Sequence, residues 1–369
     1  MKSYLLKLNN FILRLDSLTP SFCPIFFEKV KKKLKDDDLL SRSFAQYKCQ
    51  FYKNRKIFFI NLLLLLFVPF LILIPLVLFF FSRGENLENE SDIVSVLPDK
   101  SIIPESFDNN VICSYNKFDF FSFTYKDLSF CYGVIFRYFF KPFFWLKCLY
   151  VICAYCGVTK IGYKEILVSN EYSFTSSILT KYFRNYEMIC SNCMHGEKVL
   201  CLRDCYSTYD NFYVWDNYYS KLLESMSVKA NFKVAACDAL GLDLIPDGCH
   251  GDIIFYLQGF ETIDDLVLIR EKLEKLSQMF ELSFFVKPHP RYFNKDLNIV
   301  FDEKDVLNLE FKEAVLRSKI IVSNYSTVLF QAFYNRSNKK IPFLIVNDLV
   351  SIPEKYIMSE KADMFFSDF

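Results

Sequence analysis

Glycine is scarce in this chain of 369 residues, with nine glycines where an average chain carries about 7%. Neither G-x-G-x-x-G nor G-x-x-x-x-G-K-S/T occurs, which argues against the Gly-rich loops of dinucleotide-binding and P-loop proteins. The 52% hydrophobic content excludes a disordered or collagen-like chain. The length excludes a small disulfide-stapled domain and suggests roughly two domains.

Histidine and metal-binding carboxylate pairs are scarce as well. The three histidines are His195, His250 and His289. The single Asp-x-Asp, Asp36–Asp38, lies in a basic N-terminal region away from the rest of the chain. The sequence therefore predicts neither a metal nor an organic cofactor.

The thirteen cysteines do not look like a disulfide framework, because their number is odd and several lie in close pairs. They suggest a reducing compartment. Two of the pairs, Cys190/Cys193 and Cys201/Cys205, could together supply four thiolates to zinc. The apolar, strand-like surroundings of the first pair favour buried thiols instead.

Charge and hydrophobicity divide the chain near residue 56. Residues 1–56 hold 13 Lys/Arg and 5 Asp/Glu, whereas the remainder holds 31 and 38. Ile57 to Phe81 then runs for 25 residues without a charge, and Asn61 is its one strongly polar member. A helix of that length, at about 1.5 Å per residue, reaches across a bilayer core. We therefore predict a membrane segment over 57–81, with 1–56 as a basic juxtamembrane leader on anionic lipid.

The topology of this segment is left open by Pro69 and Pro75, which favour kinks. A kinked segment could enter and leave the membrane on the same face instead of crossing it. Together with the unpaired cysteines, this favours a body that faces the cytoplasm at a bacterial inner membrane. The basic residues cluster beside the apolar run and not on the body, which argues against nucleic acid as a partner.

Short apolar runs alternate with helical patterns after residue 90, as in Glu165–Ser169 followed by Phe174–Arg184. The alternation predicts an α/β fold with two doubly wound, Rossmann-like domains, 90–245 and 250–369, that face a cleft. Ligands of such sheets bind at the carboxyl ends of the strands. The aromatic stretch Cys131–Val158 is either a membrane-interface segment or an ordinary buried helix of the first domain.

Two turns of the second domain have the chemistry of phosphate binding. One is Lys287-Pro288-His289-Pro290-Arg291, where the prolines restrain three cationic or proton-donating side chains. The other is Ser323-Asn324-Tyr325-Ser326-Thr327, whose hydroxyls precede a predicted helix start that attracts anions. In the first domain, His195 follows a predicted strand and could act as a general base.

Taken in order, these turns resemble those of bacterial GT-B glycosyltransferases that build surface polysaccharide, including sialyltransferases and teichoic-acid glycerophosphotransferases. The resemblance covers roughly 165–346 and rests on MHGEK (194–198), YVWDNYY (213–219), KPHPR (287–291) and SNYSTVLFQAF (323–333). It implies two Rossmann-like domains, one for the acceptor and one for the donor nucleotide.

The resemblance also implies roles for individual residues. His289, with Lys287 and Arg291, and the hydroxyls of Ser323, Ser326 and Thr327 would hold the phosphate of a nucleotide-activated donor, for example a CMP- or CDP-linked one. His195 would be the base, as in the glycerophosphotransferases. Asp247 before Gly248 is the nearest match to the acid of the sialyltransferases, and Glu197 is another base or base partner.

The predicted function is metal-independent transfer of a sugar from a nucleotide donor to a glycan or lipid-linked acceptor, extending a capsule or lipopolysaccharide. A glycerophosphate or polyol-phosphate transferase is the alternative enzyme. A membrane-tethered scaffold with a degenerate nucleotide fold is the non-enzyme alternative.

Overall fold

The computed structural model describes the residues listed at the end of this sentence, to which every statement below refers: 22–34, 38–82, 91–107, 112–115, 122–241, 251–259, 261–289, 294–324, 326–335, 343–349 and 356–369. The chain forms two compact units. Unit 1 comprises Met1–His195 and Leu200–Ala236, and unit 2 comprises Gly196–Val199 and Cys237–Phe369. The short segment 196–199, just after the candidate base, thus belongs to the second unit.

Unit 1 is built on a parallel sheet with the order β2-β1-β3-β4-β5-β6. Its strands are β1 (Ile93–Ser95), β2 (Ile112–Ser114), β3 (Glu165–Val168), β4 (Ile189–Cys193), β5 (Thr208–Val214) and β6 (Lys229–Val234). The direction of winding reverses between β1 and β3, which makes the carboxyl ends of these two strands a topological switch point.

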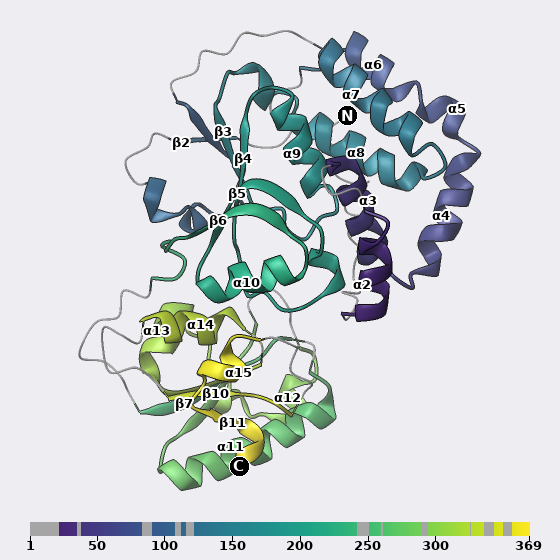
Figure 1. Ribbon diagram of the computed structural model, residues 1–369. Helices are drawn as coiled ribbons and strands as arrows, with labels where there is room; N and C mark the ends of the chain where they lie inside the picture. Colours follow the sequence, from purple (N-terminus) through teal and green to yellow (C-terminus); the bar gives the residue numbers. More distant parts are fainter. Residues whose placement is uncertain are drawn as a thin grey trace. The chain divides into compact units, whose positions relative to one another are not determined.

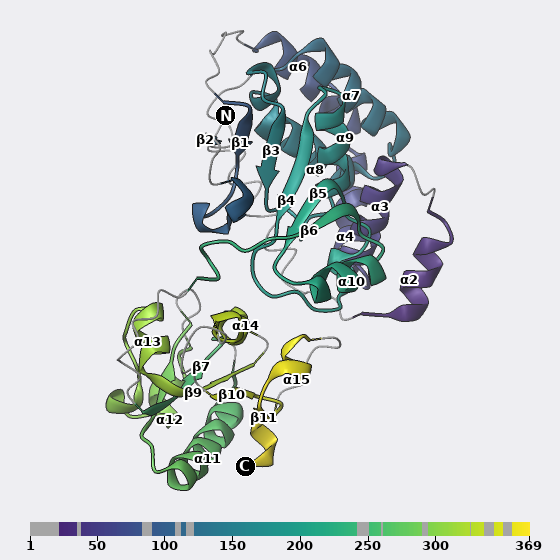
Figure 2. The ribbon, with the colours of Figure 1, turned by 60° about the vertical axis from the view of Figure 1, so that its left-hand side comes forward.

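Helices cover this sheet, and α7, α8, α9 and α3 lie together on one side of it (Figures 1 and 2). Their bounds are α7 (Tyr125–Arg137), α8 (Pro142–Tyr155), α9 (Ser176–Arg184) and α10 (Asn217–Ser225). Pro142 starts α8, and nearly every side chain of that helix is buried. Of the two interpretations of the aromatic stretch, the structure therefore shows the buried helix over 142–155.

Part of the basic N-terminal region belongs to the body of unit 1. It contains α2 (Pro24–Lys31) and α3 (Leu39–Gln50), and α3 packs against α9. The buried Arg42 side chain joins α3 to the residues at the start of β5 and before β6. Its Nε donates to Thr208 Oγ1 at 2.6 Å, and its guanidinium also donates to the carbonyls of Ser207 and Ser227. A segment predicted as a leader on the membrane is thus, over 39–50, an interior helix.

The apolar run predicted as one membrane helix forms three short helices, α4 (Arg55–Leu65), α5 (Val68–Leu71) and α6 (Ile74–Phe80). Pro69 and Pro75 each lie in the first turn of the helix that follows a break, where a missing N–H does no harm. No single helix among the described residues is long and apolar enough to cross a membrane. Arg55–Leu65 and Val68–Phe80 meet the requirement only as a pair, and that pair is bent by 77°.

Unit 2 repeats the winding of unit 1 in a parallel sheet of order β11-β10-β9-β7-β8. Its strands are β7 (Asp252–Tyr256), β8 (Phe284–Lys287), β9 (Ser318–Ser323), β10 (Phe343–Val346) and β11 (Met364–Phe365). Its helices are α11 (Ile263–Phe280), α12 (Leu297–Val300), α13 (Phe311–Arg317), α14 (Thr327–Tyr334) and α15 (Met358–Lys361). Here the switch point lies between the carboxyl ends of β7 and β9.

The core of unit 2 forms where the apolar face of α11 meets β7 and β8. Thr262 and Asp265 form a capping box that starts α11 at the expected position. The predicted α/β class with two parallel-sheet units is confirmed by these two sheets.

Removal of Arg42 tests whether the basic region is part of the fold. Arg42→Ala leaves buried acceptors in β5 and its neighbours without their donor, which costs about 1–3 kcal/mol of unfolding free energy. Lys48→Ala, at an exposed position of the same helix, should change it by less than about 0.5 kcal/mol. Urea unfolding of the full chain in mild detergent, followed by tryptophan fluorescence, measures both. Equal effects of the two substitutions would contradict the docking of α3.

Candidate functional site

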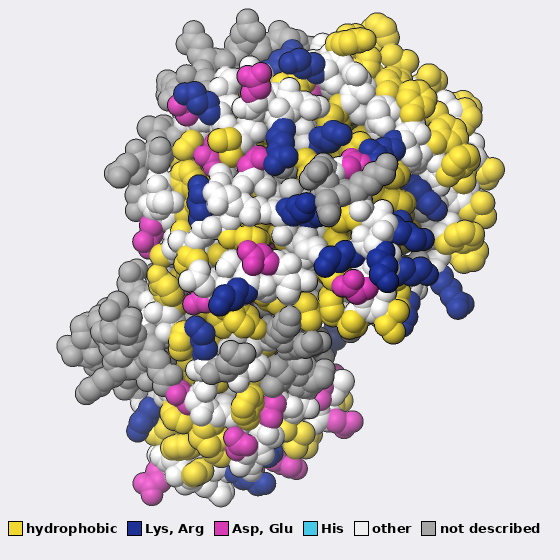
Figure 3. Space-filling model, viewed as in Figure 1, with side chains coloured by type: hydrophobic (Ala, Val, Ile, Leu, Met, Phe, Trp, Pro, Cys, Tyr) yellow, Lys and Arg dark blue, Asp and Glu magenta, His cyan; other side chains and the backbone are white. Residues whose placement is uncertain are grey.

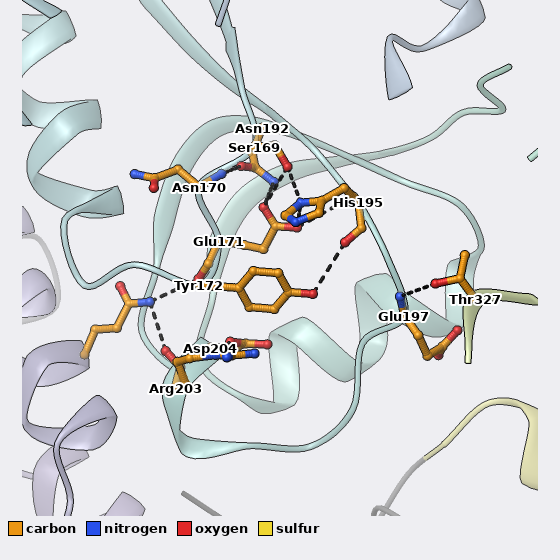
Figure 4. A network of polar contacts seen from close by, with 11 residues as sticks. Ser169, Asn170, Glu171, Tyr172, Asn192, His195, Glu197, Arg203, Asp204 and Thr327 are labelled. Carbon is orange, nitrogen blue, oxygen red and sulfur yellow. Dashed lines mark hydrogen bonds and ion pairs between the residues drawn. The ribbon is translucent and has the colours of Figure 1, made fainter. Parts of the chain in front are cut away.

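Two turns at the carboxyl edge of the unit 1 sheet lie against each other (Figure 4). One follows β3 and carries Ser169, Asn170 and Glu171; the other follows β4 and ends at His195. The Asn170 N–H donates to Asn192 Oδ1 at 2.9 Å, which ties the first turn to the end of β4. Gly196, with φ of 67°, then lets the chain turn in the left-handed region directly after His195.

A buried carboxylate holds this arrangement together. Glu171 is 1% exposed, and its Oε2 accepts a hydrogen bond from Asn192 Nδ2 at 3.1 Å. Its Oε1 accepts from the His195 backbone N–H at 3.3 Å and lies 3.2 Å from His195 Nδ1. A buried carboxylate needs such donors, because its desolvation is otherwise unfavourable.

These contacts determine the tautomer of His195. Ser169 Oγ is hydrogen-bonded to the same Nδ1, and it lies 3.4 Å from Glu171 Oε2, to which its hydroxyl donates. Since a carboxylate only accepts, the proton of the neutral imidazole belongs on Nδ1. Nε2 is then the basic nitrogen. The His195 side chain is 36% exposed, so a substrate hydroxyl can approach it.

An aromatic ring and a cation form the neighbouring wall. The Tyr172 ring stands edge-on to the imidazole at 5.1 Å, and its hydroxyl donates to the His195 carbonyl at 3.4 Å. The Arg203 guanidinium lies 4.2 Å from the centre of the Tyr172 ring. Burial opposes the charge of Arg203, but the Asp204 carboxylate at 3.2 Å, Cys201 and Tyr172 together outweigh burial and raise the pKa of the guanidinium. This edge therefore presents a base beside a fixed positive charge.

The second unit contains the remaining described candidates. The Ser323 hydroxyl is buried and donates to the Tyr256 carbonyl at 3.0 Å, so it links β9 to β7. Ser326 Oγ caps α14 by accepting from the Val328 N–H at 3.3 Å. Thr327 Oγ1 accepts from the Glu197 N–H at 3.2 Å (Figure 4). The structure thus brings three of the predicted hydroxyls to one strand end, but all three already have protein partners.

The cationic candidates come from another strand. Lys287 ends β8 and donates to the Leu309 carbonyl; burial lowers the pKa of its ammonium group, while Glu310 opposes that effect. His289 follows two residues later and is half-buried. Because β7 separates β8 from β9, these residues start about 10 Å from the Ser323 end. Asp247 and Arg291 lie outside the described residues.

Near the switch point of unit 2, within the described ranges, the Asn324 amide has a donor without a hydrogen-bond partner. Asn324 is 1% exposed and accepts from Asn347 Nδ2 at 2.6 Å, but its own Nδ2 has no hydrogen-bond partner within the described ranges. The Tyr356 hydroxyl accepts from the Ser326 N–H at 3.1 Å, just before α14. On the other side of the switch, the Gln258 and Gly259 N–H groups donate to the Glu261 carboxylate at 2.6 and 2.8 Å.

Within the described ranges no group of His, Cys, Asp and Glu side chains could hold a metal ion. The paired cysteines considered for zinc are free thiols and buried; burial raises the pKa of Cys190 to about 12.

No family model, curated protein or solved structure matches this chain. The resemblance to polysaccharide glycosyltransferases therefore stays a prediction.

Glu171 is the functional candidate that sequence reasoning missed. It lies two residues after the strand predicted over 165–169, in the same kind of post-strand turn that singled out His195. Applying that rule to acidic residues would have found it. Its contact with His195 depends on the pairing of β3 with β4, which no local pattern contains.

The role of Glu171 is tested by Glu171→Gln. One carboxylate oxygen becomes an NH₂ group, which then faces a donor of either Asn192 or His195 in place of the acceptor that was there. We therefore expect the free energy of unfolding to fall by about 1–3 kcal/mol. We also expect His195 to lose its preference for the Nδ1–H tautomer, since that preference comes from the carboxylate. Long-range ¹H–¹⁵N NMR spectra of the imidazole report the tautomer.

The matched control is Glu224→Gln, an exposed carboxylate of α10 in the same unit. It should leave both stability and tautomer unchanged. An Nε2–H tautomer in the wild-type chain would overturn the assignment of Nε2 as the base.

Proposed function

We propose that the protein is a membrane-associated glycosyltransferase, which transfers a sugar from a nucleotide-activated donor to a glycan or lipid-linked acceptor of a bacterial capsule or lipopolysaccharide. The observation that carries the proposal is the buried Glu171 carboxylate at 3.2 Å from Nδ1 of a partly exposed histidine. In this proposal the two parallel-sheet units are Rossmann-like domains of the GT-B kind, unit 1 for the acceptor and unit 2 for the donor.

The acceptor hydroxyl would lose its proton to Nε2 of His195 as its oxygen attacks the anomeric carbon of the sugar. The bond between that carbon and the donor phosphate oxygen would break at the same time, and the nucleotide phosphate would leave with the electron pair. The imidazolium that forms would lie next to the Glu171 carboxylate, 3.2 Å from Nδ1, which would stabilise its charge. Ser169 and the His195 N–H contact keep the ring oriented during the transfer. Glu197, whose backbone N–H donates to Thr327 Oγ1, stays the alternative base or base partner.

The donor phosphate would lie on the β9 side of the switch point in unit 2. The N-terminus of α14 provides partial positive charge there, and Asn324 Nδ2 is an available donor. The β7 side is already occupied, because Glu261 takes the N–H groups of its turn. Lys287 and His289, at and just after the end of β8, are the proposed contacts for a second phosphate of the donor.

A glycerophosphate or polyol-phosphate transferase is the second candidate. The same residues would serve it, because a histidine base after the β4 strand acts equally on an acceptor hydroxyl. Incubation with CMP-, CDP-, UDP- and GDP-linked sugars and with CDP-glycerol separates the two, since the accepted donor identifies the transferred group.

The function is tested by His195→Ala. We expect transfer from the accepted donor to fall by a factor of about 10² to 10⁴, the usual contribution of general base catalysis. Nucleotide affinity, measured by calorimetry, should stay within twofold of wild type, because the base belongs to unit 1 and the phosphate contacts to unit 2.

Ser220→Ala, at a position of α10 outside both turns, serves as the control and should leave transfer unchanged. Equal loss of transfer and nucleotide binding in His195→Ala would argue against the role of base. The absence of binding by any nucleotide would favour the scaffold interpretation.

A further inference from the structure

Unit 1 carries a large apolar surface over α4, α5 and α6. The space-filling view shows hydrophobic side chains gathered along these helices (Figure 3). Leu66, Phe70 and Phe80 are 73%, 72% and 78% exposed. The other large apolar side chains exposed there are Phe58, Phe59, Leu62, Leu63, Phe67, Leu73, Val77 and Phe81. A contiguous apolar patch of this kind marks an interaction surface.

Hydrogen bonds join α4, the α5–α6 junction and a residue just after α6 to the rest of unit 1. In α4, Asn61 is buried: its Nδ2 donates to the Tyr47 hydroxyl at 3.1 Å, and its Oδ1 accepts from the Phe143 N–H at 3.2 Å. Between α5 and α6, the Tyr132 hydroxyl donates to the Ile72 carbonyl at 3.1 Å. After α6, Ser82 Oγ accepts from the Phe123 N–H at 2.6 Å. The one polar residue of the apolar run thus faces protein, not lipid.

These contacts favour a segment α4–α6 that lies flat on the membrane over one that crosses it. α4 packs on α8 and α6 packs on α7, so both arms of the bent pair rest on the same unit. A span would need the two arms in line, whereas they are bent by 77°. Crossing would also pull Asn61, Ile72 and Ser82 away from their partners. The exposed face is therefore suited to dip into one leaflet, to the depth of about 5–10 Å typical of interfacial helices.

The charges beside this surface identify the kind of lipid. No Asp or Glu occurs between Asp38 and Glu85. Burial lowers the pKa of Lys48, and the nearby charges of Lys33 and Lys141 lower it further.

All three lysines are exposed. Lys48 follows Tyr47, whose hydroxyl contacts Asn61 of α4. Lys141 directly precedes α8, which packs on α4, and Lys33 follows α2, which packs on α3. The lysines therefore lie beside the apolar helices, where anionic headgroups relieve their repulsion.

We propose that the outer face of α4–α6 lies in one leaflet of an anionic membrane, with Lys33, Lys48 and Lys141 at the headgroups, and that no part of α4–α6 crosses the bilayer. This proposal is independent of the transferase activity. A second copy of the chain is the competing occupant of the apolar face. It would leave the three like charges uncompensated, which favours lipid.

Vesicle flotation of the full chain tests the surface. We expect binding to vesicles containing phosphatidylglycerol and weaker binding to pure phosphatidylcholine. Phe58→Ser/Leu66→Ser/Phe70→Ser should reduce binding to both by about tenfold or more, because each side chain loses apolar burial. The control Met279→Ser/Ile299→Ser removes equally exposed apolar side chains from unit 2 and should bind as wild type.

The electrostatic part has its own pair of variants. Lys33→Gln/Lys48→Gln/Lys141→Gln should abolish the preference for the anionic vesicles and leave phosphatidylcholine binding unchanged. Lys275→Gln/Lys295→Gln, at exposed positions of unit 2, should keep the preference. Equal binding of wild type to both vesicle types would overturn the headgroup assignment.

Sidedness separates a flat segment from a span. Lys53→Cys and Arg83→Cys flank α4–α6 in the sequence and should react with a membrane-impermeant maleimide from the same side of sealed vesicles. Mass spectrometry distinguishes them from native thiols, most of which are buried. Labelling from opposite sides would overturn the proposal. A second result would also overturn it: a wild-type chain that is a dimer in vesicle-free buffer and does not float when vesicles are added. The apolar face would then belong to a second copy of the chain.

Discussion

The carboxylate of Glu171 is the group on which the candidate site depends. It is buried where β3 and β4 end, and it is the common partner of Asn192, the His195 backbone and the His195 ring. Neutralising or removing it would leave several donors without an acceptor in a region of low dielectric. The position and tautomer of the histidine thus follow from one buried carboxylate, which is stabilised in turn by the donors that surround it.

Glu171 also connects the candidate site to the apolar surface of α4–α6. Gln46 of α3 donates to the Glu171 and Arg203 carbonyls at 3.2 and 3.1 Å. The next residue, Tyr47, accepts from Asn61 of α4. Helix α3 therefore lies between the proposed membrane face and the proposed base, and all of these contacts are within unit 1. An enzyme that acts on a lipid-linked acceptor would hold its base at a defined distance from the leaflet by this means.

Much of the architecture could be predicted from local patterns, and the failures have a common physical cause. Alternating strands and helices predicted two parallel sheets, and the prolines predicted the bends of the apolar run. Contacts between distant segments were not predictable in this way. The hydroxyl of Ser323, for example, donates to the carbonyl of Tyr256, because β9 pairs with β7 across 67 residues of sequence. Asn61, which looked like a polar exception in a membrane span, is a buried link between helices. The basic charge of residues 1–56 concealed Arg42, whose partners lie in the sheet region.

Hydrogen–deuterium exchange of the full chain on vesicles, with and without each activated nucleotide, tests the central claim most directly. The account predicts that one nucleotide class slows exchange at the start of α14 and at the end of β8, the two places proposed to hold its phosphates. Exchange in α10 of unit 1 should stay unchanged. If no nucleotide alters exchange anywhere in unit 2, the assignment of a nucleotide-dependent transferase is contradicted.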